Sequence, residues 1–197
     1  MIDYYKRVLE VLTDSMESIP TEIYQQIVDE CVMTLNKGGK IIASGLGKNV
    51  PICEKFVGTL NSFGIDARFL HTNTAVHGDL GIVGKNDLVF LLSKGGNTYE
   101  TVALAEYLKE RNTNTWLLSF YSDGKAAEIV DKKLVLELSN EGDEWNIVPN
   151  NSTTVYLILL QGIAIEIGKR TGVTLNDFKI NHPGGGIGAK LSGKDLW

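Results

Sequence analysis

Residues 39–49 have the sequence Gly39-Lys40-Ile41-Ile42-Ala43-Ser44-Gly45-Leu46-Gly47-Lys48-Asn49, and this stretch decides the fold. A short apolar run ends in a Gly-x-Gly-Lys turn, and helix-like sequence follows directly. Glycines let the backbone turn sharply and come close to a ligand. The first amides of the next helix favour an anion at the same point. The turn is therefore predicted to cradle a phosphate.

The same pattern of apolar strand, polar turn and helix continues along the chain. The run 87–92 is almost continuously apolar, which is typical of a strand buried on both faces. Alternating strands and helices predict a parallel sheet with helices on both faces. The predicted strands are 40–44, 65–70, 87–92, 115–120 and 133–138.

The chain is predicted to form a single domain over residues 1–197, because it contains no linker, internal repeat or low-complexity tract. Two leading helices are expected at about 3–36, from their helical spacing of apolar residues. These helices could pack against a partner subunit or cover the domain's own sheet. The tail, about 172–197, is rich in glycine and is predicted to be irregular.

Composition narrows the class of protein. With 43% hydrophobic and 22% charged residues, the 197-residue chain has the composition of a soluble globular protein. Its net charge of −5 argues against nucleic acid as the main partner, and no apolar run is long enough to span a membrane. The start of the chain lacks the apolar core of a signal peptide. Cys31 and Cys53 are expected to be reduced, buried thiols of a cytoplasmic protein.

Polar and glycine-rich segments follow four of the five predicted strands, at 44–49, 71–81, 93–98 and 139–152. Ligands of parallel sheets bind at the carboxyl ends of the strands, near the switch in strand order. These segments are therefore expected to converge on one site.

Two of these segments have two interpretations each. In Ser93-Lys94-Gly95-Gly96-Asn97-Thr98, hydroxyls and a helix start suit a phosphate, but Asn97 or Thr98 could simply cap the helix. The same alternatives hold for Ser152-Thr153-Thr154, where one residue must cap and the others could bind oxygens.

The three histidines differ in their surroundings. His71 could simply end a strand, and His77 precedes a Gly-Asp turn where it could be a structural donor. His182 lies in the tail next to Pro-Gly-Gly-Gly, where a core histidine is not expected, so it is the best candidate for proton transfer. No spacing supports a metal site. Among the carboxylates, Glu100 could support a helix cap, and spacing alone assigns Glu141 no role in its acidic loop.

The loops contain a series of motifs in a fixed order along the chain. They are Gly45-Leu46-Gly47-Lys48, His71, His77-Gly78-Asp79-Leu80-Gly81, Ser93 with Gly96, Pro149 with Ser152-Thr153-Thr154, and Asp177-Phe178 with His182-Pro183-Gly184-Gly185. Together these motifs resemble the sugar isomerase (SIS) domain family, most closely its arabinose 5-phosphate isomerase branch. The resemblance implies a three-layer α/β/α sandwich of flavodoxin-like type with a five-stranded parallel sheet. It also implies a homodimer or homotetramer with shared active sites, and chemistry that needs no cofactor or metal.

Carried over position by position, the resemblance implies active-site roles for Lys48, Glu100 or Asn97, Glu141 and His182. Glu141 lies eight residues before Pro149, and the branch has a carboxylate at that distance from the same proline. The implied substrate-binding residues are Ser44, Gly45, Gly47, Asn49, His71, His77, Asp79, Ser93, Lys94, Gly96, Asn97, Thr98, Ser152 and Thr153.

The chain departs from the family pattern at four places. Asn49 replaces a serine, Lys94-Gly95 replaces the x-Ser of a Ser-x-Ser-Gly loop, Asn97 stands where a carboxylate is common, and Thr72 replaces a proline. The phosphate pocket thus loses two hydroxyls and gains the cation Lys94. Beside the later loops, the Gly-x-Gly turn is expected to present Lys48 to the reacting end of the sugar instead of gripping phosphate.

The resulting hypothesis is a phosphosugar aldose–ketose isomerase that interconverts ribulose 5-phosphate and arabinose 5-phosphate through a cis-enediol. Either Glu141 or His182 would be the base, and Lys48 would stabilise the enediolate oxygen. Two alternatives stay open: a phosphosugar sensor or regulatory protein without turnover, and an isomerase for another ketose phosphate.

Overall fold

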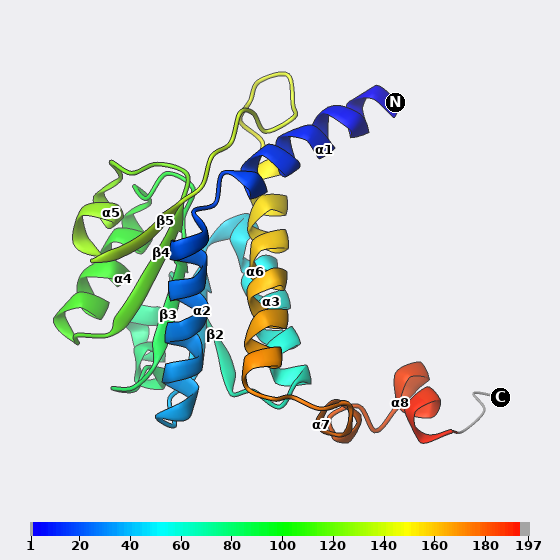
Figure 1. Ribbon diagram of the computed structural model, residues 1–197. Coiled ribbons are helices and arrows are strands. Elements are labelled where there is room, and N and C mark those ends of the chain that lie inside the picture. Colours follow the sequence, from blue (N-terminus) through cyan, green and yellow to red (C-terminus); the bar gives the residue numbers. More distant parts are fainter. Residues whose placement is uncertain (1, 194–197) are drawn as a thin grey trace.

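The computed structural model describes residues 2–193 and contains one five-stranded parallel sheet (Figure 1). The strand order is β2-β1-β3-β4-β5, so the order switches between β1 and β3. All five predicted strands are confirmed, with ends that differ by at most three residues. The strands are β1 (Ile41–Gly45), β2 (Ala67–His71), β3 (Leu88–Leu92), β4 (Asn114–Ser119) and β5 (Lys132–Val135).

The two central strands, β1 and β3, are buried at every position. Their side chains alternate between the faces of the sheet: Ile41 packs in the core on one face and Ile42 in the core on the other. This burial is the reason that β3 is almost purely apolar, because each aliphatic side chain removed from water stabilises the fold by about 1.5–3 kcal/mol.

Helices cover both faces, so the predicted three-layer sandwich is confirmed. One face packs against α2, α3, α6 and the end of α1, and the other against α4, α5 and two 3₁₀ turns (Figure 1). None of the helices in residues 2–193 has the length and apolarity needed to cross a membrane. The helices are α1 (Ile2–Glu17), α2 (Thr21–Asn36), α3 (Val50–Ser62), α4 (Tyr99–Glu110), α5 (Lys125–Ile129), α6 (Asn151–Arg170), α7 (Leu175–Ile180) and α8 (Gly185–Ser192); the 3₁₀ turns are η1 (Gly47–Asn49), η2 (Ala75–His77) and η3 (Asp79–Ile82).

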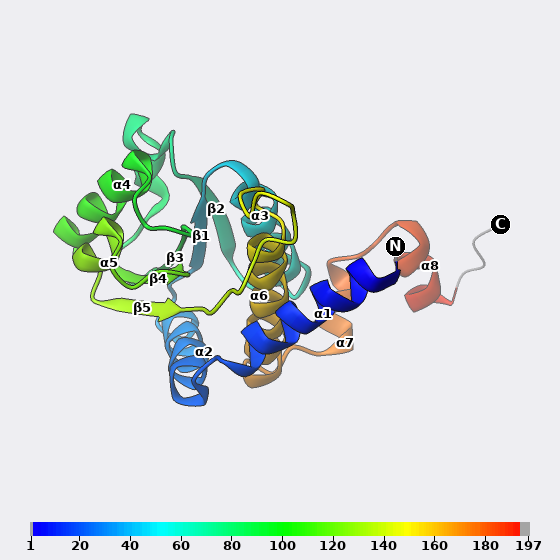
Figure 2. The same ribbon diagram turned by 90° about the horizontal axis from the view of Figure 1, so that it is seen from above.

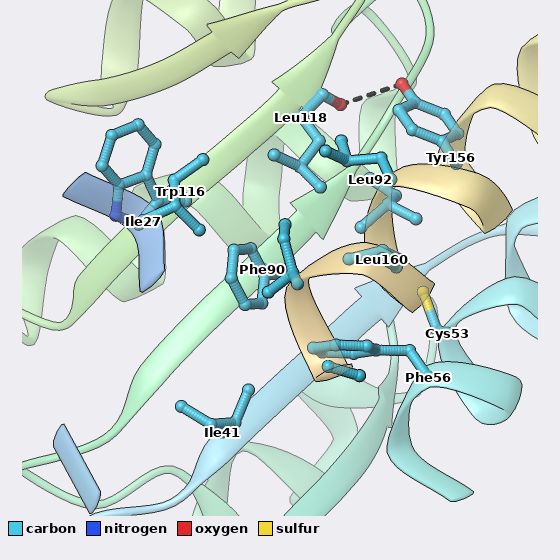
Figure 3. Packing of buried hydrophobic residues seen from close by; sticks show 14 of the residues in the cluster. Ile27, Ile41, Cys53, Phe56, Phe90, Leu92, Trp116, Leu118, Tyr156 and Leu160 are labelled. Carbon is cyan, nitrogen blue, oxygen red and sulfur yellow. Dashed lines mark hydrogen bonds between the residues drawn. The ribbon is translucent and has the colours of Figure 1, made fainter. Parts of the chain in front are cut away.

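The larger core lies between the sheet and the α2, α3 and α6 layer (Figure 3). Phe56 of α3 meets Phe90 of β3 edge to face, with ring centroids 5.7 Å apart. Tyr156 of α6 is fully buried, and its hydroxyl donates to the carbonyl of Leu118 at 2.9 Å (Figure 3). This bond ties the first turns of α6 to the carboxyl end of β4, the edge where the predicted site lies.

The two leading helices behave differently. α2 covers the protein's own sheet, with Ile27, Val28 and Cys31 in the core. α1 is buried mainly through its second half, around Val11 and Leu12, and its first half extends away from the sheet (Figure 2). The first half keeps two contacts: Val8 packs against the core, and the Tyr4 hydroxyl accepts from the Asn150 side chain at 3.2 Å. α2 therefore covers the domain's own sheet, which was the second alternative, whereas Tyr5 and Leu9 in the first half of α1 stay exposed in this chain.

The prediction of an irregular tail is wrong over residues 175–192, which form α7 and α8. The reason is local hydrogen bonding that glycine content obscured. Thr174 and Asp177 form a reciprocal capping box that starts α7. Gly188 lets α8 pack closely, because a Cβ there would lie 2.6 Å from the carbonyl oxygen of His182.

Both cysteines are free and buried, as predicted. Burial raises the pKa of Cys31, and it raises the pKa of Cys53 to about 12. Both thiols are therefore protonated packing groups near neutral pH.

The amino edge of the sheet is fastened by Asp87, which is 3% exposed. Its carboxylate accepts from the amides of Lys40 (2.9 Å) and Gly84 (2.7 Å) and pairs with the Lys40 ammonium at 2.6 Å. We expect Asp87→Asn to lower the free energy of unfolding at pH 7 by about 2 kcal/mol, because buried donors lose their charged acceptor. Urea unfolding followed by circular dichroism measures this difference.

The effect of Asp87→Asn on stability should also depend on pH. Burial acts to raise the pKa of Asp87, but Lys40 and the Gly84 amide outweigh it and hold the pKa below its ordinary value of 3.8. Such a group contributes stability that is full above the unfolded-state pKa and is lost as pH falls through the folded-state pKa. The difference in free energy of unfolding between wild type and Asp87→Asn should therefore become smaller as the pH falls through the acid range. Asp66→Asn, which removes an exposed pair with Arg68, is the control and should change stability by well under about 1 kcal/mol at any pH.

Candidate active site

A cavity of about 170 Å³ opens at the carboxyl edge of the sheet, beside the switch between β1 and β3. It is built from the loops after β1 and β3, the first turns of α4 and the start of α6. Six of the predicted site residues meet there: Lys48, Asn49, Ser93, Lys94, Thr98 and Ser152. The other lining residues are Leu46, Leu92, Gly95, Thr101 and Pro149.

The Gly-x-Gly turn shapes this cavity through its own packing. A Cβ on Gly45 would lie 2.8 Å from the Cβ of Asn49 and 3.1 Å from the sulfur of Cys53, so this glycine lets the strand end pass close to α3. Gly47 has a positive φ of 60° that turns the chain into η1. The turn therefore places Lys48, which is exposed, at the mouth of the cavity.

Two side chains of the first loop brace neighbouring strands. The buried hydroxyl of Ser44 pairs with that of Thr72 at 2.9 Å, which joins the ends of β1 and β2. Asn49 donates to the carbonyl of Leu92 at 3.3 Å, which joins the first loop to the end of β3. The departures from the family pattern at positions 49 and 72 thus have structural roles, and Ser44 lies beneath the cavity instead of on its wall.

In the 93–98 loop, neither of the two candidate residues caps α4 with its side chain. Asn97 accepts from the Lys125 amide at 3.0 Å, so it caps α5 and not α4. Thr98 occupies the N-cap position of α4, but its side chain makes no capping hydrogen bond within the described chain. The start of α4 thus lies at the cavity without a side-chain cap, in the position that binds anions.

The shape of that loop depends on small residues. The Ser93 hydroxyl accepts from the Gly96 amide at 3.2 Å, and Gly96 has a positive φ of 64°. Gly124 lies against the loop, since a Cβ there would sit 2.4 Å from the Gly95 carbonyl oxygen. Gly96 therefore contributes to the site through its backbone, because the positive φ of this turn favours a residue without a side chain.

Glu141 is fully buried behind the cavity, and its carboxylate has a partner at each oxygen. Oε1 pairs with the Lys94 ammonium at 2.5 Å, and Oε2 accepts from the amides of Asn150 (3.1 Å) and Ser152 (2.9 Å). Burial acts to raise the pKa of Glu141, but Lys94 and these amides outweigh it and hold the pKa below its ordinary value. Glu141 is thus ionised near neutral pH.

The polar groups at the start of α6 already make hydrogen bonds within the protein. Its amides hold Glu141, and the Thr153 hydroxyl donates to the carbonyl of Asn150 at 2.8 Å. Ser152 is 2% exposed and lines the cavity, whereas Thr153 is half-buried and lies outside the lining. Of these two predicted substrate-binding residues, Ser152 lines the cavity and Thr153 does not.

Four other predicted residues lie apart from the cavity lining in the described part of the chain. His71 ends the edge strand β2, where its Nδ1 accepts from the Asn73 amide at 3.2 Å. His77 is exposed in η2, and Asp79 accepts from the Thr74 hydroxyl at 2.6 Å. Glu100 is half-buried in the first turn of α4.

His182 follows α7, which lies beyond the carboxyl end of α6 (Figure 1). α6 begins at the cavity and runs for 20 residues, which corresponds to about 30 Å, before α7 starts. The His182 ring stacks on Phe178 with centroids 3.9 Å apart, and its Nδ1 lies 2.8 Å from the Phe178 carbonyl oxygen. Within one chain, His182 is therefore not brought to the cavity.

Sequence reasoning missed two contributors. Thr101 lines the cavity, and its position one turn after Thr98 on α4 was an available signal. The backbone amide of Asn150 holds Glu141, and no sequence pattern identifies a backbone donor. Within residues 2–193, no cluster of three or more His, Cys, Asp or Glu side chains is arranged to hold a metal ion.

The chain is similar to known proteins over most of its length. The chain is 31% identical over 186 residues to the arabinose 5-phosphate isomerase KdsD of Salmonella typhi, covering 94% of the chain and 57% of the relative. The chain thus spans a little over half the length of the curated relatives it matches.

Two solved structures superpose closely. A candidate phosphosugar isomerase involved in capsule formation, from Bacteroides fragilis, is 31% identical with a TM-score of 0.85, covering 95% of this chain and 99% of its own. The E. coli CFT073 protein c3406, solved in complex with arabinose 5-phosphate, is 27% identical with a TM-score of 0.83, covering 91% and 94%. Residues 34–165, more than half of the chain, match the SIS domain. This chain therefore belongs to the SIS domain family.

Proposed function

We propose that this protein is a phosphosugar aldose–ketose isomerase that interconverts ribulose 5-phosphate and arabinose 5-phosphate. The observation that carries the proposal is the cavity at the strand switch, which brings two lysines, four hydroxyls and an uncapped helix start together. Such a set suits a ligand with a phosphate at one end and a polarised carbonyl at the other. Similarity to the KdsD relatives and to the structure with bound arabinose 5-phosphate supports the same substrate class.

The reaction would proceed through a cis-enediol. A base removes one proton from C1 of the ketose, and the electron pair moves toward the C2 carbonyl oxygen to form an enediolate. Protonation of O2, return of a proton to C2 and loss of the O1 hydroxyl proton leave a hydroxyl at C2 and an aldehyde at C1, so atoms and electrons balance without an external oxidant. A cation next to the developing oxyanion lowers the barrier.

Phosphate would bind at the start of α4, where Ser93 and Thr98 line the cavity and the helix dipole favours an anion. The start of α6 is less suited, because Glu141 already accepts from its amides. Lys48 enters from the other side, on η1, and would face the carbonyl end of the sugar.

Two groups can serve as the base. Glu141 is ionised but stands behind the cavity wall, and His182 is about 30 Å away along α6. We infer that His182 reaches a cavity only from a second copy of the chain. The exposed apolar residues Tyr5 and Leu9 on α1, and Ile180 on α7, give such a copy a surface to bury.

A phosphosugar sensor is the second candidate. It is favoured by the loss of loop hydroxyls at Asn49 and Gly95 and by the Lys94–Glu141 pair, which neutralises two groups that an enzyme could use. A cytoplasmic location also stays a prediction, and the free thiols of Cys31 and Cys53 are in keeping with a reducing compartment.

Turnover in deuterated water separates the two functions. Incubated with ketose phosphates, the protein should incorporate deuterium at C1 of ribulose 5-phosphate and produce arabinose 5-phosphate, as followed by NMR. Label in a different sugar would move the assignment to that sugar. Binding without exchange across the whole panel would leave the sensor and refute the isomerase.

Mixing two inactive variants tests the shared site. Lys48→Met and His182→Ala should each lose most turnover, by about 100-fold or more, while His182→Ala keeps phosphosugar binding. If His182 comes from a second copy, mixed dimers contain one intact site, and activity should return to about one quarter of wild type. Sites contained in one chain would show no recovery. Lys190→Ala, an exposed change on α8, is the control and should be fully active.

Gly124→Ala tests whether the 93–98 loop holds phosphate. The added methyl group would collide with the Gly95 carbonyl, so the loop must move, and we expect KM to rise about tenfold with a loss of about 2 kcal/mol in stability. Gly58→Ala is the matched control, because its Cβ would meet nothing within 4 Å on an exposed face of α3. That control should keep KM and gain stability.

A further inference from the structure

Lys94 and Glu141 form an ion pair at the cavity, and the two side chains differ in exposure. Lys94 lines the cavity with 33% of its side chain exposed, whereas Glu141 has no exposure and is absent from the lining in the described structure. A substrate in the cavity can therefore touch Lys94 and not Glu141.

We propose that Lys94 is a phosphate-binding residue and that Glu141 is a positioning residue that acts through it. This inference rests on the proposed function and assigns the two members of the pair different parts in it. The base is then His182, not Glu141.

Glu141 is anchored on three sides. Its Oε2 accepts from two amides at the start of α6, its Oε1 pairs with Lys94, and its own amide donates to the Asn146 side chain at 2.7 Å. Each bond to the carboxylate favours the ionised form, which makes the group a weak proton acceptor. On the α6 side it also faces Tyr156, which stays neutral because burial raises the pKa of Tyr156 well above its ordinary value.

Lys94 is held at both ends. Its carbonyl accepts from the Phe120 amide and the Ser119 hydroxyl, both at 3.0 Å, and its ammonium is held by Glu141. An ammonium carries three donors, so the bond to Glu141 leaves others for a phosphate. Fixing a flexible lysine before the ligand arrives reduces the entropy lost on binding.

The position of Lys94 selects the phosphate end of the sugar. It belongs to the same loop as Ser93 and Thr98 and lies next to the uncapped start of α4. Lys48 supplies the second cation from the opposite loop. Gly95 stands where the family loop has a serine, so this chain lacks that hydroxyl. The positive charge of Lys94 would take its place in holding the phosphate.

A double-mutant cycle tests the assignment. We expect Lys94→Met to raise KM for arabinose 5-phosphate by about tenfold or more with kcat within about threefold, the signature of lost binding. Glu141→Gln, which can still accept from the α6 amides, should raise KM in the same way. In the double variant Glu141→Gln should add little, because its effect passes through Lys94. Lys94→Arg, which keeps the charge, should restore KM to within about threefold.

Several outcomes would overturn the assignment. If Glu141 is the base, Glu141→Gln lowers kcat by about 100-fold with KM unchanged, in wild type and in Lys94→Met alike. An unchanged KM in Lys94→Met would also refute it. Melting curves of all variants identify any that fail to fold; for these the double variant, which removes both charges, supplies the comparison.

Calorimetry with arabinose 5-phosphate separates this inference from the proposed function. If the wild type binds but does not turn over, the isomerase proposal fails, and the Lys94 inference still predicts weaker binding in Lys94→Met and in Glu141→Gln. If the wild type turns over normally and both variants bind as tightly as wild type, only the Lys94 inference fails.

Discussion

A carboxylate without solvent access must be matched by donors, and this constraint organises the candidate site. Glu141 is completely buried, so its charge has to be balanced inside the protein. The balance is supplied by Lys94 from the loop after β3 and by two amides at the start of α6. One buried charge thereby fixes the relative positions of two loops that are far apart in the sequence.

The same constraint divides the work between two helix starts. Two amides at the start of α6 donate to the Glu141 carboxylate, so a negative charge of the protein already occupies the positive end of this helix dipole. The start of α4 has no side-chain cap in the described structure, because Asn97 turns away to cap α5. The cavity therefore lies beside one occupied and one open helix start, although both segments are rich in hydroxyls. Counting hydroxyls in a loop does not distinguish these two situations.

The sequence predicts the sheet well because its signal is strong and local. The apolar run of β3 and the glycine-terminated run of β1 could hardly be anything except buried parallel strands, and six predicted residues meet at their carboxyl ends. Two features were beyond reach. The helices of the tail depend on a capping box that its glycines obscured, and the burial of Glu141 depends on Lys94, 47 positions earlier in the chain. Long-range polar pairing leaves no periodic pattern, whereas hydrophobic burial does.

The position of His182 follows from the architecture. In a parallel sheet every strand ends at the same edge, so the helix that follows a strand must run back to the opposite edge. α6 starts at the cavity and carries the chain away from it over 20 residues, and nothing in α7 returns it. A group after α6 can thus join a cavity only across an interface between copies, where a twofold axis can place the tail of each chain at the strand ends of the other. The first half of α1 projects from the same body with exposed apolar side chains, which is the kind of surface that such an interface would cover (Figure 2). Because α6 carries the chain away from the cavity, any part that His182 has in activity requires an oligomer.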